Sequence, residues 1–277
     1  MSYKIVSDSS SNLLSLANFP YTSVPLHIIV GDQSFVDDET LNIHDMYQAL
    51  SAYKGATSTS CPSPDDWIRA FDNADVVFCV TITSGLSGSC ASAHAAKQMY
   101  EEQHPEKQVF IVDSLSTGPE MVLLIEKIKA LLEQDMNPEK IYEEITKYQK
   151  NTHLYYALSS LDNLAKNGRV NPLIAKGIGA LGIRIIGTKS KEGTLKPVNK
   201  ARGDKKAMQK IIDYMKSCGY HGGRVIISHS ENPAAVEILQ KLLQTEFGDY
   251  DGFVHENTGL CGYYAEENSV LVGFETV

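Results

Sequence analysis

The chain has 277 residues, enough for one large domain or two of ordinary size. Hydrophobic residues make up 43% of it and charged residues 21%, proportions that exclude a disordered chain, a collagen-like repeat and a disulfide-dense miniprotein. The net charge of −9 argues against binding nucleic acid or an anionic membrane through overall charge, so we expect no nucleic-acid partner.

Strands and helices alternate in the first half of the chain. Apolar runs predict strands at residues 3–6, 21–30, 76–81 and 109–112, and helical spacing predicts helices at 42–54, 65–73, 90–103, 119–134 and 138–150. Pro25 indicates an edge position or a bulge, and residues 57–64, rich in Ser, Thr and Pro, are expected to form a loop. This order of elements is typical of parallel βαβ units.

Three loops should meet at one edge of this parallel sheet. In such sheets the loops that leave the carboxyl ends of the strands converge on the ligand site. Here those loops are Ser7–Ser10, Ser84–Ser89 and Asp113–Thr117. All three are rich in small hydroxyl side chains, and none carries a basic residue.

The second half of the chain follows a different pattern. Strands are predicted at 154–158, 184–188, 195–199, 224–230, 253–256 and 270–274, and helices at 161–167, 205–217 and 233–247. The strands at 184–188 and 195–199 flank a Lys-Glu-Gly turn that is typical of a hairpin. We therefore predict an α/β fold of two domains, comprising residues 1–157 and residues 158–277.

The sequence shows no signal for export or membrane insertion. The first residues lack the basic segment and long apolar stretch of a signal peptide, and runs such as 121–125 fall far short of the ~20 residues of a membrane-spanning helix. The five cysteines are odd in number and include no Cys-x-x-Cys pair, which favours reduced thiols over disulfides or zinc. We therefore expect a cytoplasmic protein without an integral membrane segment.

The turn Ser84–Ser89 is the sharpest local feature. A strand enters it and a helix leaves it, which presents free backbone N–H groups and the positive end of the helix dipole to an anion. The Ser87 hydroxyl would add a donor. The alternative is an ordinary capped helix start, because Ser and Gly are preferred there in any case.

The same turn is similar to the nucleophile elbow Gly-x-Ser-x-Gly, with Ser89 at its last position. A serine hydrolase would also need an acid and a late histidine, and His229 and His255 are late enough. A hydrolase that uses Ser87 is therefore an alternative function. A regulatory module that senses another small acidic metabolite is a third.

Other segments bear on ligand chemistry. The two prolines of residues 57–64 restrict a hydroxyl-rich loop that can hold a carboxylate or phosphate, although a surface loop has the same composition. Gly177–Gly182 matches Gly-x-Gly-x-x-Gly, but no strand precedes it, so we reject a dinucleotide site. The acidic residues Asp37–Glu39 are expected to form a solvated turn rather than a metal site. Neither a metal nor a cofactor is predicted for the chain.

Motifs spread over nearly the whole chain resemble the DegV family of bacterial fatty-acid-binding proteins. They are Ile5-Val6-Ser7-Asp8-Ser9, Val24-Pro25-Leu26 with Asp37 and Asp38 after it, Thr59-Ser60-Cys61-Pro62-Ser63-Pro64, Ser84-Gly85-Leu86-Ser87-Gly88-Ser89, Val112-Asp113-Ser114, Leu164 through Gly168-Arg169-Val170, and Lys196-Pro197. The resemblance implies a parallel-sheet N-terminal domain and a mixed α/β C-terminal domain. One long-chain fatty acid would lie in an apolar tunnel between them.

The resemblance also implies a head-group site and a partner. The carboxylate would meet Thr59 and Ser87, with the Gly88 N–H beside it and Ser84 in the same turn. Arg169 would lie near the carboxylate or on a kinase-facing surface. The family's role is to present the fatty acid to a separate fatty acid kinase, which makes an acyl phosphate for phospholipid synthesis. The chain would then be a lipid-binding carrier and not an enzyme.

One corner departs from the family pattern. The family often carries His-Thr-Gly-Pro-Gly near its C-terminus, and aligning Thr258-Gly259 with it puts Asn257 at the histidine position. His255, two residues earlier, is the candidate substitute. Cys61 likewise replaces the usual polar residue in the Thr59 segment.

Overall fold

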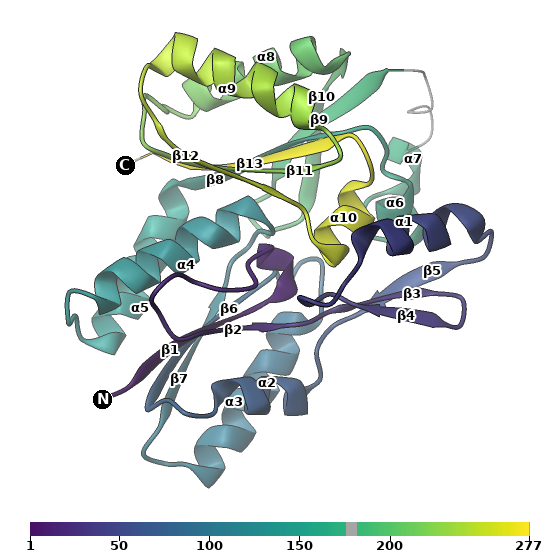
Figure 1. Cartoon of the computed structure of the whole chain (residues 1–277). Helices are drawn as coiled ribbons and strands as arrows, with labels where there is room; N and C mark the ends of the chain where they lie inside the picture. Colours follow the sequence, from purple (N-terminus) through teal and green to yellow (C-terminus); the bar gives the residue numbers. More distant parts are fainter. Residues whose placement is uncertain (176–181, 277) are drawn as a thin grey trace.

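The structure is a computed structural model that describes residues 1–175 and 182–276 (Figure 1). The strands are β1 (Tyr3–Asp8), β2 (Tyr21–Val24), β3 (His27–Val30), β4 (Gln33–Val36), β5 (Thr57–Ser60), β6 (Val76–Thr81), β7 (Gln108–Asp113), β8 (Thr152–Leu158), β9 (Ile183–Lys189), β10 (Leu195–Arg202), β11 (Arg224–Ser230), β12 (Asp251–Glu256) and β13 (Ser269–Glu275). The α-helices are α1 (Ile43–Ala52), α2 (Pro64–Phe71), α3 (Ser89–Gln103), α4 (Pro119–Leu132), α5 (Pro138–Tyr148), α6 (Asp162–Lys166), α7 (Pro172–Ala175), α8 (Asp204–Ser217), α9 (Pro233–Phe247) and α10 (Gly259–Ala265).

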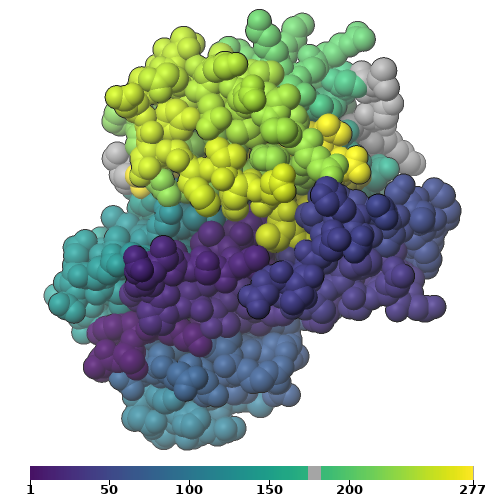
Figure 2. Space-filling model, viewed as in Figure 1, coloured from purple at the N-terminus to yellow at the C-terminus, as the bar shows by residue number. Residues whose placement is uncertain are grey.

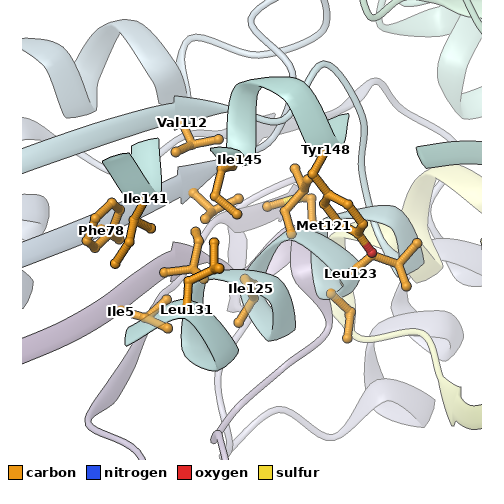
Figure 3. Close-up of a cluster of buried hydrophobic side chains, with 14 of the residues drawn as sticks. Ile5, Phe78, Val112, Met121, Leu123, Ile125, Leu131, Ile141, Ile145 and Tyr148 are labelled. Carbon is orange, nitrogen blue, oxygen red and sulfur yellow. The ribbon is translucent and has the colours of Figure 1, made fainter. Parts of the chain in front are cut away.

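Sheet A is the parallel sheet that the sequence predicts, with strand order β2-β1-β6-β7. Helices α2 and α3 cover one face and α4 and α5 the other (Figure 1). Figure 3 shows the core on the second face, where Ile125 of α4 and Ile141 and Ile145 of α5 pack toward Ile5 and Phe78 of the sheet. Burial of each such side chain contributes about 1.5–3 kcal/mol to the free energy of folding. The sheet therefore holds the loops at its edge in fixed positions.

The predicted strand at residues 21–30 is wrong in one respect, because it is two strands in different sheets. Strand β2 pairs with β1 in sheet A, whereas β3 pairs with β4 and β5 in the antiparallel sheet B. Pro25 has no N–H to donate to a ladder, and the Leu26 N–H donates to Ser9 Oγ (3.0 Å) instead. The chain therefore changes sheets at this point.

The predicted loop at residues 57–64 is wrong in part, because residues 57–60 form β5. Thr57 and Thr59 are half-buried while Ser58 and Ser60 are exposed, which is the alternation of a strand with one covered face. Pairing with β3 overrides the loop-like composition of this segment.

Sheet C is mixed, as the family resemblance implies. Its order is β10-β9-β8-β13-β11-β12, in which only the β11–β12 pair is parallel. The predicted hairpin is formed by β9 and β10, and α8 and α9 cover the outer face of the sheet (Figure 1). Strand β8 belongs to this sheet and ends at Leu158, so the predicted boundary between residues 157 and 158 falls inside the strand.

The two halves of the chain are closely packed against each other. Figure 2 shows the green and yellow C-terminal half resting on the purple and blue N-terminal half. Helix α4 lies between sheet A and sheet C. At Gly273 of β13 a β-carbon would lie 2.6 Å from the Pro119 carbonyl carbon, so only glycine allows this close approach of α4.

Three expectations from the sequence concern the glycine-rich segment, membrane-spanning helices and the cysteines. The Gly177–Gly182 segment lies almost entirely outside the described residues. Within residues 1–175 and 182–276, no helix combines the length and apolar character needed to cross a membrane. The five cysteines are all free thiols, and none is joined in a disulfide.

Candidate functional site

A cavity lies where the three sheets meet, and its empty space of about 660 Å³ is partly open to solvent. Its aliphatic lining consists of Leu26, Ile82, Leu86, Leu154, Leu158, Leu164, Leu195, Leu260 and Leu271. Strand β8 builds part of this wall by alternation. Leu154, Tyr156 and Leu158 face the cavity, and Tyr155 and Ala157 face the core beneath α8 and α9. The lining therefore suits an extended apolar ligand.

Three of the predicted site residues line this cavity together. Thr59 comes from β5, Ser87 from the turn before α3, and Arg169 from the segment after α6. They are far apart in the sequence, and it is the packing of sheets B and C onto the edge of sheet A that places them around one space.

The turn before α3 leaves the Ser87 hydroxyl free to donate. The Ser87 N–H donates to Thr83 O (3.2 Å), and Ser87 Oγ accepts the Ser89 N–H (3.2 Å). A hydroxyl that accepts still has one proton to donate. Ser87 therefore offers a hydrogen-bond donor to a group in the cavity.

Asp8 at the end of β1 anchors this turn from the protein interior. Its buried carboxylate accepts the Ser89 hydroxyl (2.6 Å), the Ile82 N–H (2.9 Å) and the Ser10 hydroxyl. Burial raises the pKa of Asp8, and these hydrogen bonds act in the opposite direction. The Ser7–Ser10 and Ser84–Ser89 loops thus converge, as the parallel sheet predicts.

Arg169 carries a charge that no acidic side chain of the described residues neutralises. Its Nε donates to Leu86 O (3.1 Å) and its Nη1 to Asn167 O (2.5 Å), and no carboxylate in residues 1–175 and 182–276 pairs with it. By contrast, Arg184 is paired with Asp204. A guanidinium has five N–H donors, so Arg169 keeps donors and a full charge for an anion in the cavity.

Ser84 and Gly88 lie in the same turn but outside the lining, and both are exposed. The Ser84 N–H donates to Asp113 Oδ1 (3.2 Å), which joins the second loop to the third. A β-carbon on Gly88 would lie 3.3 Å from Cys61 Sγ, so glycine lets the segment after β5 approach the start of α3. These two residues form the part of the turn that is exposed at the surface.

Neither candidate for the family histidine lines the cavity. Asn257 is 2% exposed and is bonded to Asn12 (3.2 Å) and Ser230 (3.0 Å). His255 is half-buried, its ring stacks on Phe253, and its Nε2 has no hydrogen-bond partner in the described part of the chain. Both residues support the packing behind the cavity rather than its wall.

The burial of His255 predicts a pH dependence of stability. Desolvation, together with the nearby His229, lowers the pKa of His255 from 6.5 to about 4. The folded state holds the neutral ring, whereas the unfolded chain binds a proton below about pH 6.5. The free energy of unfolding should fall by on the order of 3 kcal/mol from this residue as the pH drops from 7 to 4.

His255→Gln should remove much of this loss in urea unfolding measured across that pH range. The pKa of His229 is also lowered by burial, so some pH dependence should remain. The same substitution at the exposed His221 is the matched control. Equal pH dependence of wild type and His255→Gln would contradict the prediction.

Helix α10 supplies a wall of the cavity that the sequence did not predict. Its residues Leu260, Cys261 and Tyr264 line the cavity. The buried Asp37 carboxylate accepts the Gly259 N–H (2.6 Å) and the Leu260 N–H (2.9 Å) at the start of this helix. The expected solvated turn at Asp37 is therefore wrong. No local signal could have found a partner that lies more than 200 residues away.

Tyr156 brings an unpaired hydroxyl into an apolar region. It is 1% exposed, and its hydroxyl has no partner among the described residues. Burial raises the pKa of this phenol. Tyr156→Phe should therefore stabilise the ligand-free protein, by about 1 kcal/mol, because it removes an unsatisfied polar group.

Urea unfolding of delipidated Tyr156→Phe measures this gain. Tyr155→Phe is the matched control, because the Tyr155 hydroxyl on the opposite face of β8 is within 3.7 Å of Cys218 Sγ. A loss of stability in Tyr156→Phe would show that an ordered water satisfies the hydroxyl.

The arrangement gives no support to a serine hydrolase. No described histidine lines the cavity, and Ser87 Oγ is bonded to a backbone N–H rather than to a base. The described residues also hold no cluster of three or more His, Cys, Asp or Glu side chains suited to a metal ion.

Comparison with known proteins adds to this geometry. A family model described as "Uncharacterised protein, DegV family" matches residues 2–276. A DegV domain-containing protein of Streptococcus pneumoniae is 42% identical over 279 residues, which cover 99% of each chain.

Two solved structures share the whole fold. The DegV family protein from Eubacterium eligens loaded with heptadecanoic acid is 39% identical, with a TM-score of 0.98 and full coverage of both chains. The Streptococcus pneumoniae Fatty Acid Kinase (Fak) B3 protein loaded with linoleic acid is 42% identical, with a TM-score of 0.97 and full coverage of both chains.

Proposed function

Since this chain belongs to the DegV family, we propose that it binds one long-chain fatty acid in the cavity and presents the carboxylate to a separate fatty acid kinase. The acyl phosphate made by that kinase would enter phospholipid synthesis, and the chain itself would act as a carrier without catalysing the reaction. The main support is the combination of a leucine-rich cavity with Thr59, Ser87 and Arg169 in its wall. The fatty acids bound to the two similar structures support the ligand class.

The free energies assign different tasks to the two ends of the ligand. Burying ten methylene groups of an acyl chain contributes about 8 kcal/mol at ~0.8 kcal/mol each. Each charge-assisted hydrogen bond to the carboxylate adds roughly 1.5–3 kcal/mol. The acyl chain of the ligand would therefore supply most of the affinity, and the polar residues would fix the direction in which the ligand lies. A small acidic metabolite would leave most of the aliphatic lining unfilled.

The position of the turn supports presentation to a partner. Ser84 and Gly88 are exposed, and Ser87 between them lines the cavity. A carboxylate bound at Ser87 would lie close to the surface, within reach of a phosphoryl donor held by another protein. Because a kinase draws on cellular nucleoside triphosphate, this partnership also implies the cytoplasmic location expected from the sequence.

Denaturing extraction of the purified protein, followed by mass spectrometry, tests ligand binding. We expect a co-purified long-chain fatty acid, and binding of added oleate or palmitate after delipidation. Absence of both would overturn the proposal.

Two further assays separate carrier from enzyme. With a bacterial fatty acid kinase, ATP and oleate, acyl phosphate should form only when the carrier is present, and the carrier alone should form none. A fluorophosphonate probe should leave Ser87 unlabelled. Labelling of Ser87 would instead favour the serine hydrolase.

A further inference from the structure

Tyr264 of α10 is bonded to one of the head-group residues. Its hydroxyl lies 2.8 Å from Thr59 Oγ1, and both residues line the cavity. Tyr264 is the only side chain in residues 1–175 and 182–276 that bonds to this hydroxyl. The contact joins residues 205 positions apart in the sequence.

The direction of this bond decides what Thr59 can offer to a ligand. An aliphatic hydroxyl has one proton and two lone pairs, and an ionised carboxylate only accepts. A phenol is more acidic than an aliphatic alcohol, so it is the better donor of the two. When Tyr264 donates to Thr59 Oγ1, the Thr59 proton is left for a second acceptor in the cavity.

We propose that Tyr264 is a positioning residue for the carboxylate, because its hydroxyl donates to Thr59 Oγ1 and so directs the Thr59 proton toward the head group. This role rests on the proposed function. It makes the head-group site a relay of two hydroxyls, one from α10 and one from β5, alongside Ser87.

The ring of the neighbouring Tyr263 holds Tyr264 in place for this role. Its ring packs edge-on against Tyr263, with ring centroids 4.8 Å apart and planes at 71°. The Tyr263 hydroxyl is bonded to Thr57 Oγ1 (2.6 Å) and accepts from Asn167 Nδ2 (2.8 Å). Two consecutive tyrosines are thus bonded to two alternate threonines of β5.

Tyr263 provides a matched control for Tyr264. Both hydroxyls bond to a threonine of β5, but Tyr263 and its partner Thr57 do not line the cavity. A phenylalanine substitution removes one hydroxyl from the same helix in each case. Only the Tyr264 variant should alter recognition of a carboxylate.

The test compares oleate and methyl oleate binding to the delipidated full chain. Tyr264→Phe should weaken oleate binding about three- to tenfold, the size of one hydrogen bond, and change methyl oleate binding less than twofold. Tyr263→Phe should change neither. Equal losses for both ligands would assign Tyr264 a purely structural role and overturn the proposal.

A second variant separates action through Thr59 from direct contact with the ligand. In a Thr59→Val background, Tyr264→Phe should have little further effect on oleate binding. If the full loss persists there, Tyr264 contacts the carboxylate itself and the relay is wrong. Wild-type affinity for oleate in Tyr264→Phe overturns the relay alone, whereas a wild-type chain that binds no oleate overturns the proposed function as well.

Discussion

Replacing both Thr59 and Ser87 with alanine is expected to weaken oleate binding by about 100- to 10,000-fold. In the proposed site each substitution removes a hydroxyl that would donate to the carboxylate, and each charge-assisted hydrogen bond is worth roughly 1.5–3 kcal/mol. Both side chains are half-buried and belong to the cavity wall, so the fold should persist. Titration of delipidated protein with oleate measures the effect.

Methyl oleate and a matched pair of substitutions control this experiment. Ser58→Ala combined with Ser84→Ala changes exposed hydroxyls in the same two segments, and neither residue lines the cavity. That variant should bind oleate like the wild type. The Thr59 and Ser87 variant should keep its affinity for methyl oleate, because the aliphatic lining is unchanged. Oleate affinity within threefold of wild type would remove these two residues from the site.

The kinase assay distinguishes orientation from affinity. At saturating oleate the cavity of the Thr59 and Ser87 variant is filled, but its carboxylate is no longer held in one position. Acyl phosphate formation should therefore stay low even when binding is complete. Full activity at saturation would mean that the two hydroxyls contribute affinity only.

The sequence predicts those parts of the site that depend on local order. The turn Ser84–Ser89 is predictable because a strand enters it and a helix leaves it, and both elements are present as β6 and α3. The convergence of this turn with Ser7–Ser10 followed from the parallel sheet and is visible in the bonds of Asp8 to Ser10 and Ser89. Local sequence is sufficient here because the hydrophobic repeat of a strand or a helix is visible within the element itself.

The parts that were missed depend on contacts between distant segments. Helix α10 has seven residues, too few for a clear helical period, and its first turn is capped by Asp37 from the other end of the chain. Strand β5 has a loop-like composition and exists because it pairs with β3. The Tyr264–Thr59 contact joins these two elements, so nothing in either local sequence could have revealed it.

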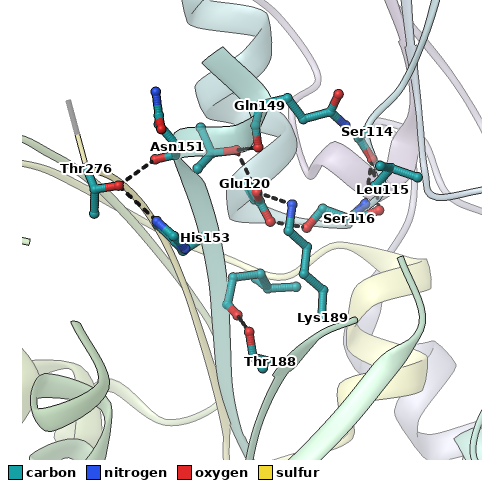
Figure 4. A network of polar contacts seen from close by, with 12 residues as sticks. Ser114, Leu115, Ser116, Glu120, Gln149, Asn151, His153, Thr188, Lys189 and Thr276 are labelled. Atoms are coloured by element: carbon teal, nitrogen blue, oxygen red, sulfur yellow. Dashed lines mark hydrogen bonds and ion pairs between the residues drawn. The ribbon is translucent and has the colours of Figure 1, made fainter. Parts of the chain in front are cut away.

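A buried ion pair holds the two halves of the chain together around the cavity. Glu120 of α4 is fully buried, and its Oε1 lies 2.5 Å from Lys189 Nζ of β9. Figure 4 shows Glu120 and Lys189 within a polar network. The Thr152 hydroxyl (2.6 Å) and the Ser116 hydroxyl (2.5 Å) donate to the same carboxylate. All polar atoms of the carboxylate are thus satisfied, and its charge is compensated by one lysine.

Lys189→Met should lower the free energy of unfolding by about 3–5 kcal/mol, because it leaves the Glu120 charge buried without compensation. Pairing it with Glu120→Gln should recover part of the loss, since no net charge is then buried. Lys191→Met, an exposed lysine of the same hairpin, should cost less than about 0.5 kcal/mol. Urea unfolding at neutral pH measures all three variants. A loss below 1 kcal/mol in Lys189→Met would mean that water reaches Glu120 and that the pair is not what joins α4 to sheet C.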